Sequence, residues 1–356
     1  MSGNTFGKIF KIATWGESHG PGVGVVVEGC PAGLPLKESE IQKELDRRKT
    51  GQSKVTTTRR ESDKIRFMSG VFQGQTTGTP ISMLVENQDA DSSKYELIKD
   101  LYRPGHADYT YQMKYGRRDY RGGGRSSARE TVGRVAAGAI ARKLLKRQKI
   151  KITGYTRQIG SLRAKNFDFR EIEKNIVRCP DKIMADKMIA HVMKVRKKGD
   201  SVGGVVEVVA EGVPPGLGEP VFDRLDADLA KAVMSIPAVK GVEIGVGFEA
   251  AEMLGSECND AFIMKGRKIA TRTNHAGGIL GGISNGETIV LRLVVKPTSS
   301  INKTQDTVTR TGKKSTINVE GRHDPCICPR AVPIAEAMVA LTLIDHFLRQ
   351  QLSQLK

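Results

Sequence analysis

The sequence predicts an α+β fold in which two similar units set antiparallel strands around a helical core, and two internal echoes carry this prediction. Residues 25–35 (VVVEGCPAGLP) are matched by residues 208–218 (VVAEGVPPGLG) at seven of eleven positions. Residues 69–74 (SGVFQG) are echoed by residues 277–282 (GGILGG), and the two motifs keep the same order in each half. The spacing between copies far exceeds a solenoid repeat, so we expect two copies folded into one core.

The two units show the same order of predicted elements, and we place them at about residues 6–90 and 200–298 of one domain spanning residues 1–356. In each, a β-branched strand near residues 24–28 or 205–211 ends in a Pro-Gly turn and leads into a helix. Two strands joined by a glycine-containing turn then complete the unit. Strands connected by hairpins rather than by crossovers favour antiparallel sheets, with the helices collected beside them.

Apolar residues at three- and four-residue steps predict the helices. A central helix at about residues 128–148 lies between the units in sequence, and its small residues indicate a close-packed position. A packed helix is expected within residues 182–200, and a last amphipathic helix at residues 333–348 closes the core. The helical positions within the units are Ile41 and Leu45 in the first, and Leu225, Leu229, Ala232 and Val233 in the second.

A glycine loop at residues 120–131 (YRGGGRSSARET) precedes the central helix. Its three consecutive glycines allow positive φ and a close approach of backbone to ligand, and the helix start beyond them presents unpaired N–H groups to an anion. Glycine loops before helices are also common connectors, so the spacing alone does not establish phosphate binding. Arg121, Arg125 and Arg129 recur at four-residue steps around the loop, which favours a dianionic ligand.

The charge balance indicates a polyanionic partner. Lysine plus arginine exceed aspartate plus glutamate by 57 − 39 = 18, and the sequence pI is about 9.7. Nucleic acid, an acidic membrane, and small substrates carrying phosphates and carboxylates all fit this excess. Single-strand binders stack bases on aromatic side chains, and these make up only 5% of the chain. A basic RNA-binding protein remains the alternative function on composition.

The cysteines and the N-terminus predict a soluble, cytoplasmic protein. Five scattered cysteines suit reduced thiols in a cytosol. His323, Cys326 and Cys328 lack a second ligand pair at zinc-finger spacing, so we expect no metal site. The N-terminus has no apolar core for a signal peptide, and we count no run of about 18 apolar residues, so we expect no membrane segment.

Two histidines on glycine-rich turns are candidates for proton transfer near neutral pH. His19 follows Ser18 on a turn that we expect to be exposed, and His106 lies on a Pro-Gly corner. Residues 320–325 (EGRHDP) bring an arginine and a carboxylate in front of a proline. Residues 296–300 (KPTSS) offer a cation and three hydroxyls that suit a phosphate group.

Four motifs together resemble the chorismate synthase family: GESHG at residues 16–20, RPGHAD at 103–108, GRSSARET at 124–131 and GRHDP at 321–325. The resemblance spans essentially the whole chain in order. It implies loss of phosphate and a ring hydrogen from 5-enolpyruvylshikimate 3-phosphate, a 1,4-anti elimination that gives chorismate. It also implies a need for reduced FMN without net redox change, and a layered β-α-β sandwich assembled as a homotetramer that binds neither nucleic acid nor membrane.

The resemblance assigns roles to matching positions. His19 would protonate the departing phosphate, His106 would serve the anionic reduced flavin, and Asp324 would relay a proton near the flavin ring, together with Ser18. Arginine forks match phosphate and carboxylate oxygens. The substrate or NADP contacts would be Arg48, Lys54, Arg103 and Arg129. The FMN contacts would be Arg125, Ser126, Ser127, Pro237, Ala238, Gly281, Lys296, Pro297, Thr298, Ser299, Ser300 and Arg322.

Two positions depart from the family's pattern. Lys54 stands where the family often has arginine, which keeps the charge but loses the bidentate fork. Pro237 stands where we expect asparagine, which removes a side-chain amide and a backbone N–H. The resemblance leaves open whether NADPH reduces the flavin on the protein or an external system supplies it. A flavin reductase in its own right is a third possible function.

Overall fold

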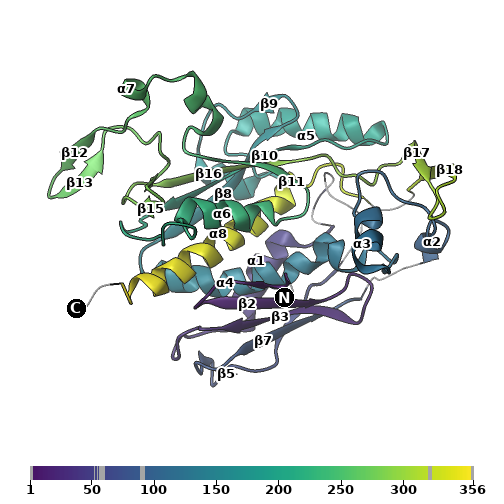
Figure 1. Cartoon of the computed structure of the whole chain (residues 1–356), viewed down its shortest axis with the longest axis horizontal. Coiled ribbons are helices and arrows are strands. Elements are labelled where there is room, and N and C mark those ends of the chain that lie inside the picture. The colour runs from purple at the N-terminus through teal and green to yellow at the C-terminus, as the bar shows by residue number, and fades with distance from the viewer. Residues whose placement is uncertain are drawn as a thin grey trace.

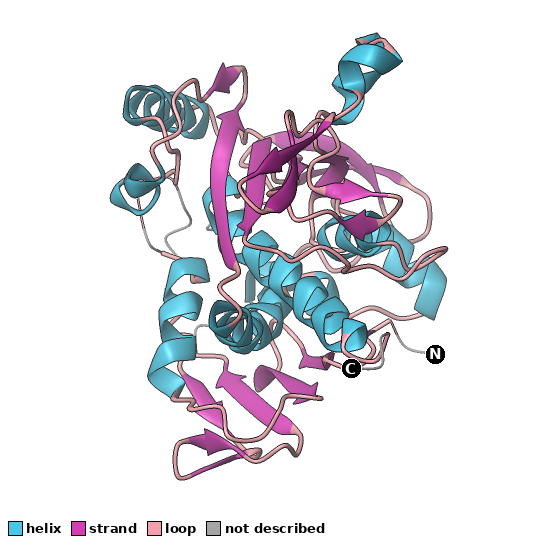
Figure 2. Ribbon diagram, turned by 90° about the vertical axis from the view of Figure 1, so that its left-hand side faces the viewer, coloured by secondary structure: helices cyan, strands magenta, loops and turns pink. Residues whose placement is uncertain are grey.

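The computed structural model describes residues 3–51, 53, 55, 61–88, 93–319 and 323–353, and it has three layers. Helices fill the space between two five-stranded antiparallel sheets (Figure 1). A view turned by 90° shows the same helices between the two sets of strands (Figure 2). This is the layered α+β fold that the sequence and the family resemblance predicted.

The two sheets correspond at four of their five strand positions. At one edge the chain order differs, because the edge strand precedes its neighbour in the first sheet and follows its neighbour in the second. From edge to edge, the first sheet contains β1 (Thr5–Phe6), β2 (Lys11–Gly16), β3 (Gly22–Glu28), β7 (Ile81–Glu86) and β4 (Ile65–Phe67). The second contains β9 (Leu162–Arg163), β8 (Lys151–Ile159), β10 (Gly204–Glu211), β16 (Ile289–Val295) and β11 (Val239–Ile244). The echoed segments supply the central strands β3 and β10, each paired antiparallel to β7 or β16.

The echoed turns make the same hydrogen bonds in both units. Each turn packs against a small hairpin, β5 (Val71–Phe72) with β6 (Gln75–Thr76) in the first unit and β14 (Ile279–Leu280) with β15 (Ile283–Ser284) in the second. The hydroxyl of Thr76 accepts from the backbone N–H of Leu34 at 2.9 Å, and Ser284 accepts from Leu217 at 2.8 Å. Both hydroxyls donate to the carbonyl of a proline in the turn at 2.6 Å.

The middle layer consists of α1 (Glu38–Arg48), α4 (Thr131–Arg147), α6 (Leu225–Met234) and α8 (Cys328–Gln350). The small residues of α4 allow the close packing that the sequence indicated, because a Cβ added at Gly138 would lie only 2.4 Å from Cβ of Ala337 in α8. The α-helix begins at Thr131 rather than near residue 128, because Ala128–Glu130 form a separate 3₁₀ turn.

The expectation of an amphipathic last helix is wrong, and α8 also begins earlier than predicted. Apart from Arg330, every residue from Cys328 to His346 is buried, because the second sheet and helices α1, α4 and α6 pack against this segment. Its best 18-residue window has a mean hydropathy of 1.6, which is apolar enough to cross a membrane, yet 89% of that window is buried inside the protein. The helix therefore belongs to the core. Charged residues within it interrupt the apolar sequence, so a count of uninterrupted apolar runs does not find this window.

The remaining elements gather at the two ends of the layers (Figure 1). One end carries α2 (Ser93–Glu96), α3 (Asp108–Tyr115) and the hairpin of β17 (Thr304–Val308) and β18 (Lys314–Asn318). The other carries α7 (Gly255–Cys258) and the projecting hairpin of β12 (Phe262–Lys265) and β13 (Lys268–Thr271). The packed helix expected within residues 182–200 is α5 (Lys182–Lys197).

Candidate active site

A cavity of about 640 Å³ lies where the first turns of α4 and α8 meet the loops at one end of the helical layer. This volume suits a small organic ligand, and the positive ends of two helix dipoles at the cavity favour an anion. It brings together most of the residues that the family resemblance assigned: Ser18, His19, Arg48, Arg103, His106, Arg125, Ser126, Ser127, Arg129, Pro237, Ala238, Lys296, Pro297, Thr298, Ser299, Ser300 and Asp324.

Three assigned residues are not in this lining. Lys54 and Arg322 lie outside the described residues. Gly281 is exposed in the turn between β14 and β15, and that hairpin pairs with Gly216, which packs near Gln350 at the C-terminal end of α8. Since the 23 residues of α8 span roughly 35 Å, Gly281 lies about a helix length from the cavity of its own chain.

The glycine loop approaches the two histidines rather than open space. Gly122 and Gly123 both have positive φ, at +60° and +86°. A Cβ added at Gly122 would lie 2.0 Å from Cε1 of His19, and one at Gly123 would lie 3.0 Å from Cε1 of His106. Each of two consecutive glycines thus contacts one of the two imidazoles, and these contacts are a second reason for glycine here besides the positive φ.

The turn that carries Ser18 and His19 is enclosed on several sides. The backbone N–H of Ser18 donates to the carbonyl of Gly124 at 3.4 Å, and the side-chain amide of Asn87 donates to two carbonyls of the turn at 2.7 and 2.9 Å. The ring of His19 meets Tyr95 edge-on, with the centroids 5.3 Å apart. Ser18 is only 2% exposed, so the expectation of an exposed turn is wrong there, because the glycine loop packs over it.

His106 is oriented by a buried carboxylate. Its Nδ1 lies 3.0 Å from Oδ1 of Asp108, which also accepts from Arg103 at 2.7 Å and pairs with Arg118 at 3.0 Å. Burial opposes ionisation of Asp108, but the hydrogen bonds from Arg103 and His106 hold its pKa far below the ordinary value. The carboxylate therefore only accepts. Its contact favours a neutral ring with the proton on Nδ1 and Nε2 as the acceptor, although Nη2 of Arg103 also lies 3.1 Å from Nδ1.

The charge state of His106 follows from the same surroundings. Burial lowers the pKa of His106, and Arg103 and Arg118 lower it further, while Asp108 opposes them. The net shift is downward from an ordinary value near 6.5, so the ring is neutral at pH 7.

The structure separates the three arginines that were expected to surround one dianion. Arg121 is exposed and pairs with Asp119 at 2.9 Å, away from the cavity lining. Arg125 lines the cavity, but its guanidinium donates to two backbone carbonyls of β2 at 3.1 and 3.2 Å. Arg129 lines the cavity as well and is anchored by buried acceptors behind it. A sequence step of four residues could not show this, because these arginines lie in a loop and 3₁₀ turns rather than on one helical face.

Asp324 and the 296–300 segment form another part of the lining. The carboxylate of Asp324 pairs with Arg330, and its backbone carbonyl accepts from the Thr298 hydroxyl at 2.9 Å. Lys296 Nζ donates to the hydroxyl of Ser299 at 2.6 Å, and burial lowers the pKa of this lysine.

Pro237 and Ala238 present backbone to the cavity. Ala238 has φ +72°, a left-handed conformation that costs energy for a residue with a Cβ, and such residues cluster at functional sites. Its carbonyl accepts from the backbone N–H of Lys296 at 2.9 Å, which ties the two segments together.

Several lining residues escaped sequence reasoning, namely Glu61, Tyr95, Arg134, His323 and Arg330. His323 was weighed only as a zinc ligand, and among the described residues no group of three His, Cys, Asp or Glu side chains is placed to hold a metal. Tyr95, Glu61 and Arg330 follow no local pattern, since tertiary packing alone brings them to the cavity.

Two repeated α+β units that enclose one cationic cavity, with paired imidazoles and a buried carboxylate behind one of them, define an enzyme that acts on a small polyanionic molecule. A model of the chorismate synthase family matches residues 10–348. A protein described as chorismate synthase from Chloroflexus aurantiacus is 62% identical to this chain, over 99% of this chain and 98% of its own length. One from Methanosarcina barkeri is 61% identical, over 98% of this chain and 97% of its own length.

A solved structure described as chorismate synthase superposes with a TM-score of 0.76 at 33% identity, covering 98% of this chain and 93% of that one. The chain therefore belongs to the chorismate synthase family and is an enzyme. All three comparisons agree on this function, and none supports the RNA-binding alternative.

Proposed function

We propose that this enzyme is a carbon–oxygen lyase that converts 5-enolpyruvylshikimate 3-phosphate to chorismate by 1,4-anti elimination of phosphate, with reduced FMN and no net redox change. The observation that carries the proposal is the pair His19 and His106, packed on consecutive glycines inside one cationic cavity. An elimination that expels phosphate and removes a ring hydrogen needs two placed proton carriers, and this pair supplies them.

The charge of the cavity suits a substrate with one phosphate and two carboxylates. Among the described residues, seven cationic and three acidic side chains line it, a difference of 7 − 3 = 4 positive charges. The cations are Arg48, Arg103, Arg125, Arg129, Arg134, Lys296 and Arg330, and the acids are Glu61, Glu130 and Asp324. Arginine forks can bind such oxygens in pairs, which fixes the orientation of the substrate as well as its affinity.

Proton handling follows from how each ring is held. His19 donates a proton to the departing phosphate, from a turn that Asn87 and the glycine loop hold in place. His106 takes up a proton at Nε2 and later returns it, because Nδ1 is committed to Asp108. Asp324 relays a proton in the same cavity, steadied by its ion pair with Arg330.

The donor set also suits a phosphate-bearing flavin. Hydroxyls of Ser126, Ser127, Thr298 and Ser299 line the cavity together with the ammonium group of Lys296, and such donors match a phosphate and a polyhydroxyl chain. When bound, reduced FMN would supply electron density that eases the loss of phosphate and is recovered as the ring hydrogen leaves. The backbone at Pro237 and Ala238 offers the remaining surface for it.

Phosphate release from the enolpyruvyl substrate under dithionite, with and without FMN, tests the proposal. We expect release only with the flavin. The His106→Ala variant should lose most turnover but still bind FMN, measured by flavin fluorescence. His191→Ala is the matched control, since His191 lies on α5 outside the cavity lining and should keep full activity. Full turnover by His106→Ala, or flavin-independent release, contradicts the proposal.

A separate measurement decides the source of electrons. Mixing the protein anaerobically with NADPH and oxidised FMN should bleach the flavin if the protein reduces its own cofactor. If the colour persists, an external system supplies the electrons. Of the four residues assigned to substrate or NADP, Lys54 lies outside the described residues.

We also propose a homotetramer in the cytoplasm. The β12–β13 hairpin exposes Phe262 by 67%, Met264 by 65% and Ile269 by 72%, and apolar patches of this kind favour protein contacts. Five cysteines without a disulfide suit a reducing compartment. Light scattering of the purified protein tests the assembly, and a monomer at micromolar concentration would contradict it.

A further inference from the structure

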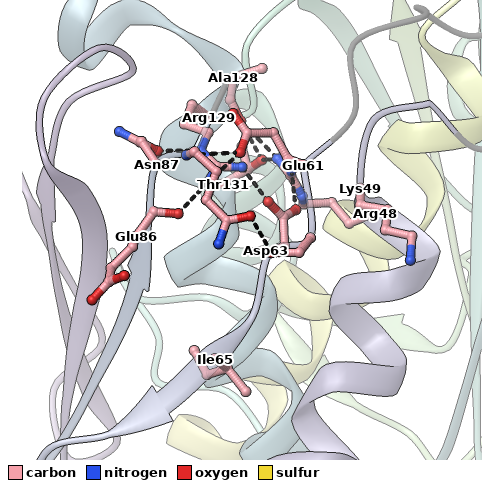
Figure 3. Close-up of polar contacts among 12 residues, drawn as sticks. Arg48, Lys49, Glu61, Asp63, Ile65, Glu86, Asn87, Ala128, Arg129 and Thr131 are labelled. Carbon is pink, nitrogen blue, oxygen red and sulfur yellow. Dashed lines mark hydrogen bonds and ion pairs between the residues drawn. The ribbon is translucent and has the colours of Figure 1, made fainter. Parts of the chain in front are cut away.

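Asp63 lies between Arg48 and Arg129, two arginines of the cavity lining (Figure 3). Its Oδ2 accepts from Nη2 of Arg48 at 2.7 Å, and its Oδ1 accepts from Nη1 of Arg129. The side chain of Asp63 is fully buried, while those of Arg48 and Arg129 are 1% and 4% exposed. Both arginines line the cavity, whereas Asp63 is not among the described residues that do. A single carboxylate thus joins two cations whose other sides face the ligand space.

Each arginine is also fixed by a second anchor, so its position depends on the network and not on the ligand. Nε of Arg129 donates to Oδ1 of Asn87 at 2.8 Å, and Asn87 is the residue whose amide holds the His19 turn. Nη1 of Arg48 approaches the Thr131 hydroxyl at the start of α4 at 3.4 Å. The network therefore connects the arginines to the turn that carries one of the two imidazoles.

Without the Asp63 carboxylate, the neighbouring guanidinium groups would repel one another. Burial lowers the pKa of Arg48 to about 10, and the neighbouring Arg330 and Arg129 lower it too, while Asp63 opposes them. Burial alone would raise the pKa of Asp63, but the two guanidinium groups hold it below the ordinary value. The backbone of Asp63 has φ +47°, a strained conformation that persists only where the surroundings enforce it.

We infer that Asp63 is a positioning residue for substrate binding: it holds Arg48 and Arg129 side by side so that both can meet one polyanionic group. This inference rests on the proposed function for the identity of the substrate. Asp63 itself does not touch the substrate, and its effect is transmitted through the orientation of the two guanidinium groups. An amide at this position could accept from one arginine but would turn its NH₂ group toward the other.

The chain offers a matched control for a merely structural ion cluster. Glu336 in α8 is 2% exposed and likewise lies between two arginines, with Arg47 at 2.5 Å and Arg142 at 3.2 Å. None of these three lines the cavity. Asp63→Asn and Glu336→Gln each remove one buried carboxylate between two arginines and change the net charge by the same amount. Any difference in ligand binding between them therefore reports position, not charge or folding.

The experiment measures substrate affinity by calorimetry without flavin, and KM and kcat with reduced FMN. We expect Asp63→Asn to raise Kd and KM about 10- to 100-fold, on the scale of the loss when the outer partner that orients a metal ligand is removed. Its kcat should change far less, because uniform binding is lost rather than transition-state stabilisation. Glu336→Gln should lose thermal stability but keep Kd and KM. A folded Asp63→Asn protein with wild-type Kd, or an equal loss in Glu336→Gln, overturns the inference.

A second variant covers the case in which Asp63→Asn does not fold, and a phosphate titration covers the case in which the proposed function is wrong. If Asp63→Asn does not fold, Asp63→Glu decides, since it keeps the charge but moves the carboxylate by one methylene. It should fold and bind the substrate more weakly, and a wild-type Kd would overturn the inference. Inorganic phosphate, titrated in parallel against thermal unfolding, probes the arginine pair without the organic substrate. If the wild-type protein turns over no enolpyruvyl substrate, the proposed function is refuted. The inference still stands if phosphate then stabilises the wild-type protein and Glu336→Gln but not Asp63→Asn.

Discussion

Replacing Gly122 by alanine should displace His19 and leave the rest of the protein intact. An ideal Cβ at Gly122 lies 2.0 Å from Cε1 of His19, and ordinary van der Waals contact begins near 3.4 Å. The imidazole must therefore move by at least 3.4 − 2.0 = 1.4 Å. Nδ1 of the same ring lies at 2.1 Å, and the nearest atom outside His19 is the Ser18 hydroxyl oxygen at 3.1 Å, so the added methyl group crowds Ser18 as well.

Two costs follow, and they fall on different measurements. Gly122 has φ +60°, and a residue with a Cβ in the left-handed region costs roughly 1–2 kcal/mol, which lowers the thermal midpoint. A misplacement of about 1 Å in a reacting group can cost about 100-fold in rate. We therefore expect Gly122→Ala to reduce kcat for phosphate release by about 100-fold or more, with only a modest loss of stability.

Gly116→Ala separates these two costs. Gly116 ends α3 with φ +68°, and nothing lies within 4 Å of its added Cβ, so it carries the backbone cost without the clash. Steady-state phosphate release and thermal unfolding of both variants form the assay. Similar midpoints with a kcat loss confined to Gly122→Ala support the reasoning. A Gly122→Ala enzyme with near wild-type kcat would show that the position of His19 does not limit the reaction.

Three further predictions address other parts of the molecule. Asp108→Asn removes the carboxylate that raises the pKa of His106, so the acid limb of kcat/KM, where the neutral ring becomes protonated, should move to lower pH. Gly138→Ala should lower the urea midpoint, because overpacking against α8 costs about 1–3 kcal/mol. The higher helix propensity of alanine would by itself raise the unfolding free energy by about 1 kcal/mol. Ser284→Ala and Thr76→Val should each cost about 1–3 kcal/mol of unfolding free energy, since both leave a buried N–H and C=O without the hydroxyl.

Each of these has a result that contradicts it. An acid limb that stays in place or moves to higher pH in Asp108→Asn would remove His106 from that limb. A raised urea midpoint in Gly138→Ala would mean that α4 and α8 are not in close contact there. Unequal losses at Ser284 and Thr76, one large and one absent, would show that the two turns are not equivalent in energy.

The duplicated fold was predictable because its signals are local. Gly29 and Gly212 occupy matching places in the echoed turns with φ +75° and +76°, a conformation that glycine adopts at little cost. The strands β3 and β10 end within the same echoed segments, so the repeat locates both of them. Their neighbours β2 and β8 also correspond in the two sheets, yet they share no comparable echo, because many apolar sequences can fill the same strand position.

For the site, sequence motifs were sufficient to name the family and many of the residues around the cavity, because those residues lie in short glycine-rich segments whose order is itself distinctive. Packing decided how they are held. Arg125 faces β2, Ser18 is enclosed, and Asp63 pairs with Arg129 across 66 positions of sequence. Such contacts depend on which elements meet in space, and no spacing along the chain encodes the burial that makes one carboxylate the partner of two arginines.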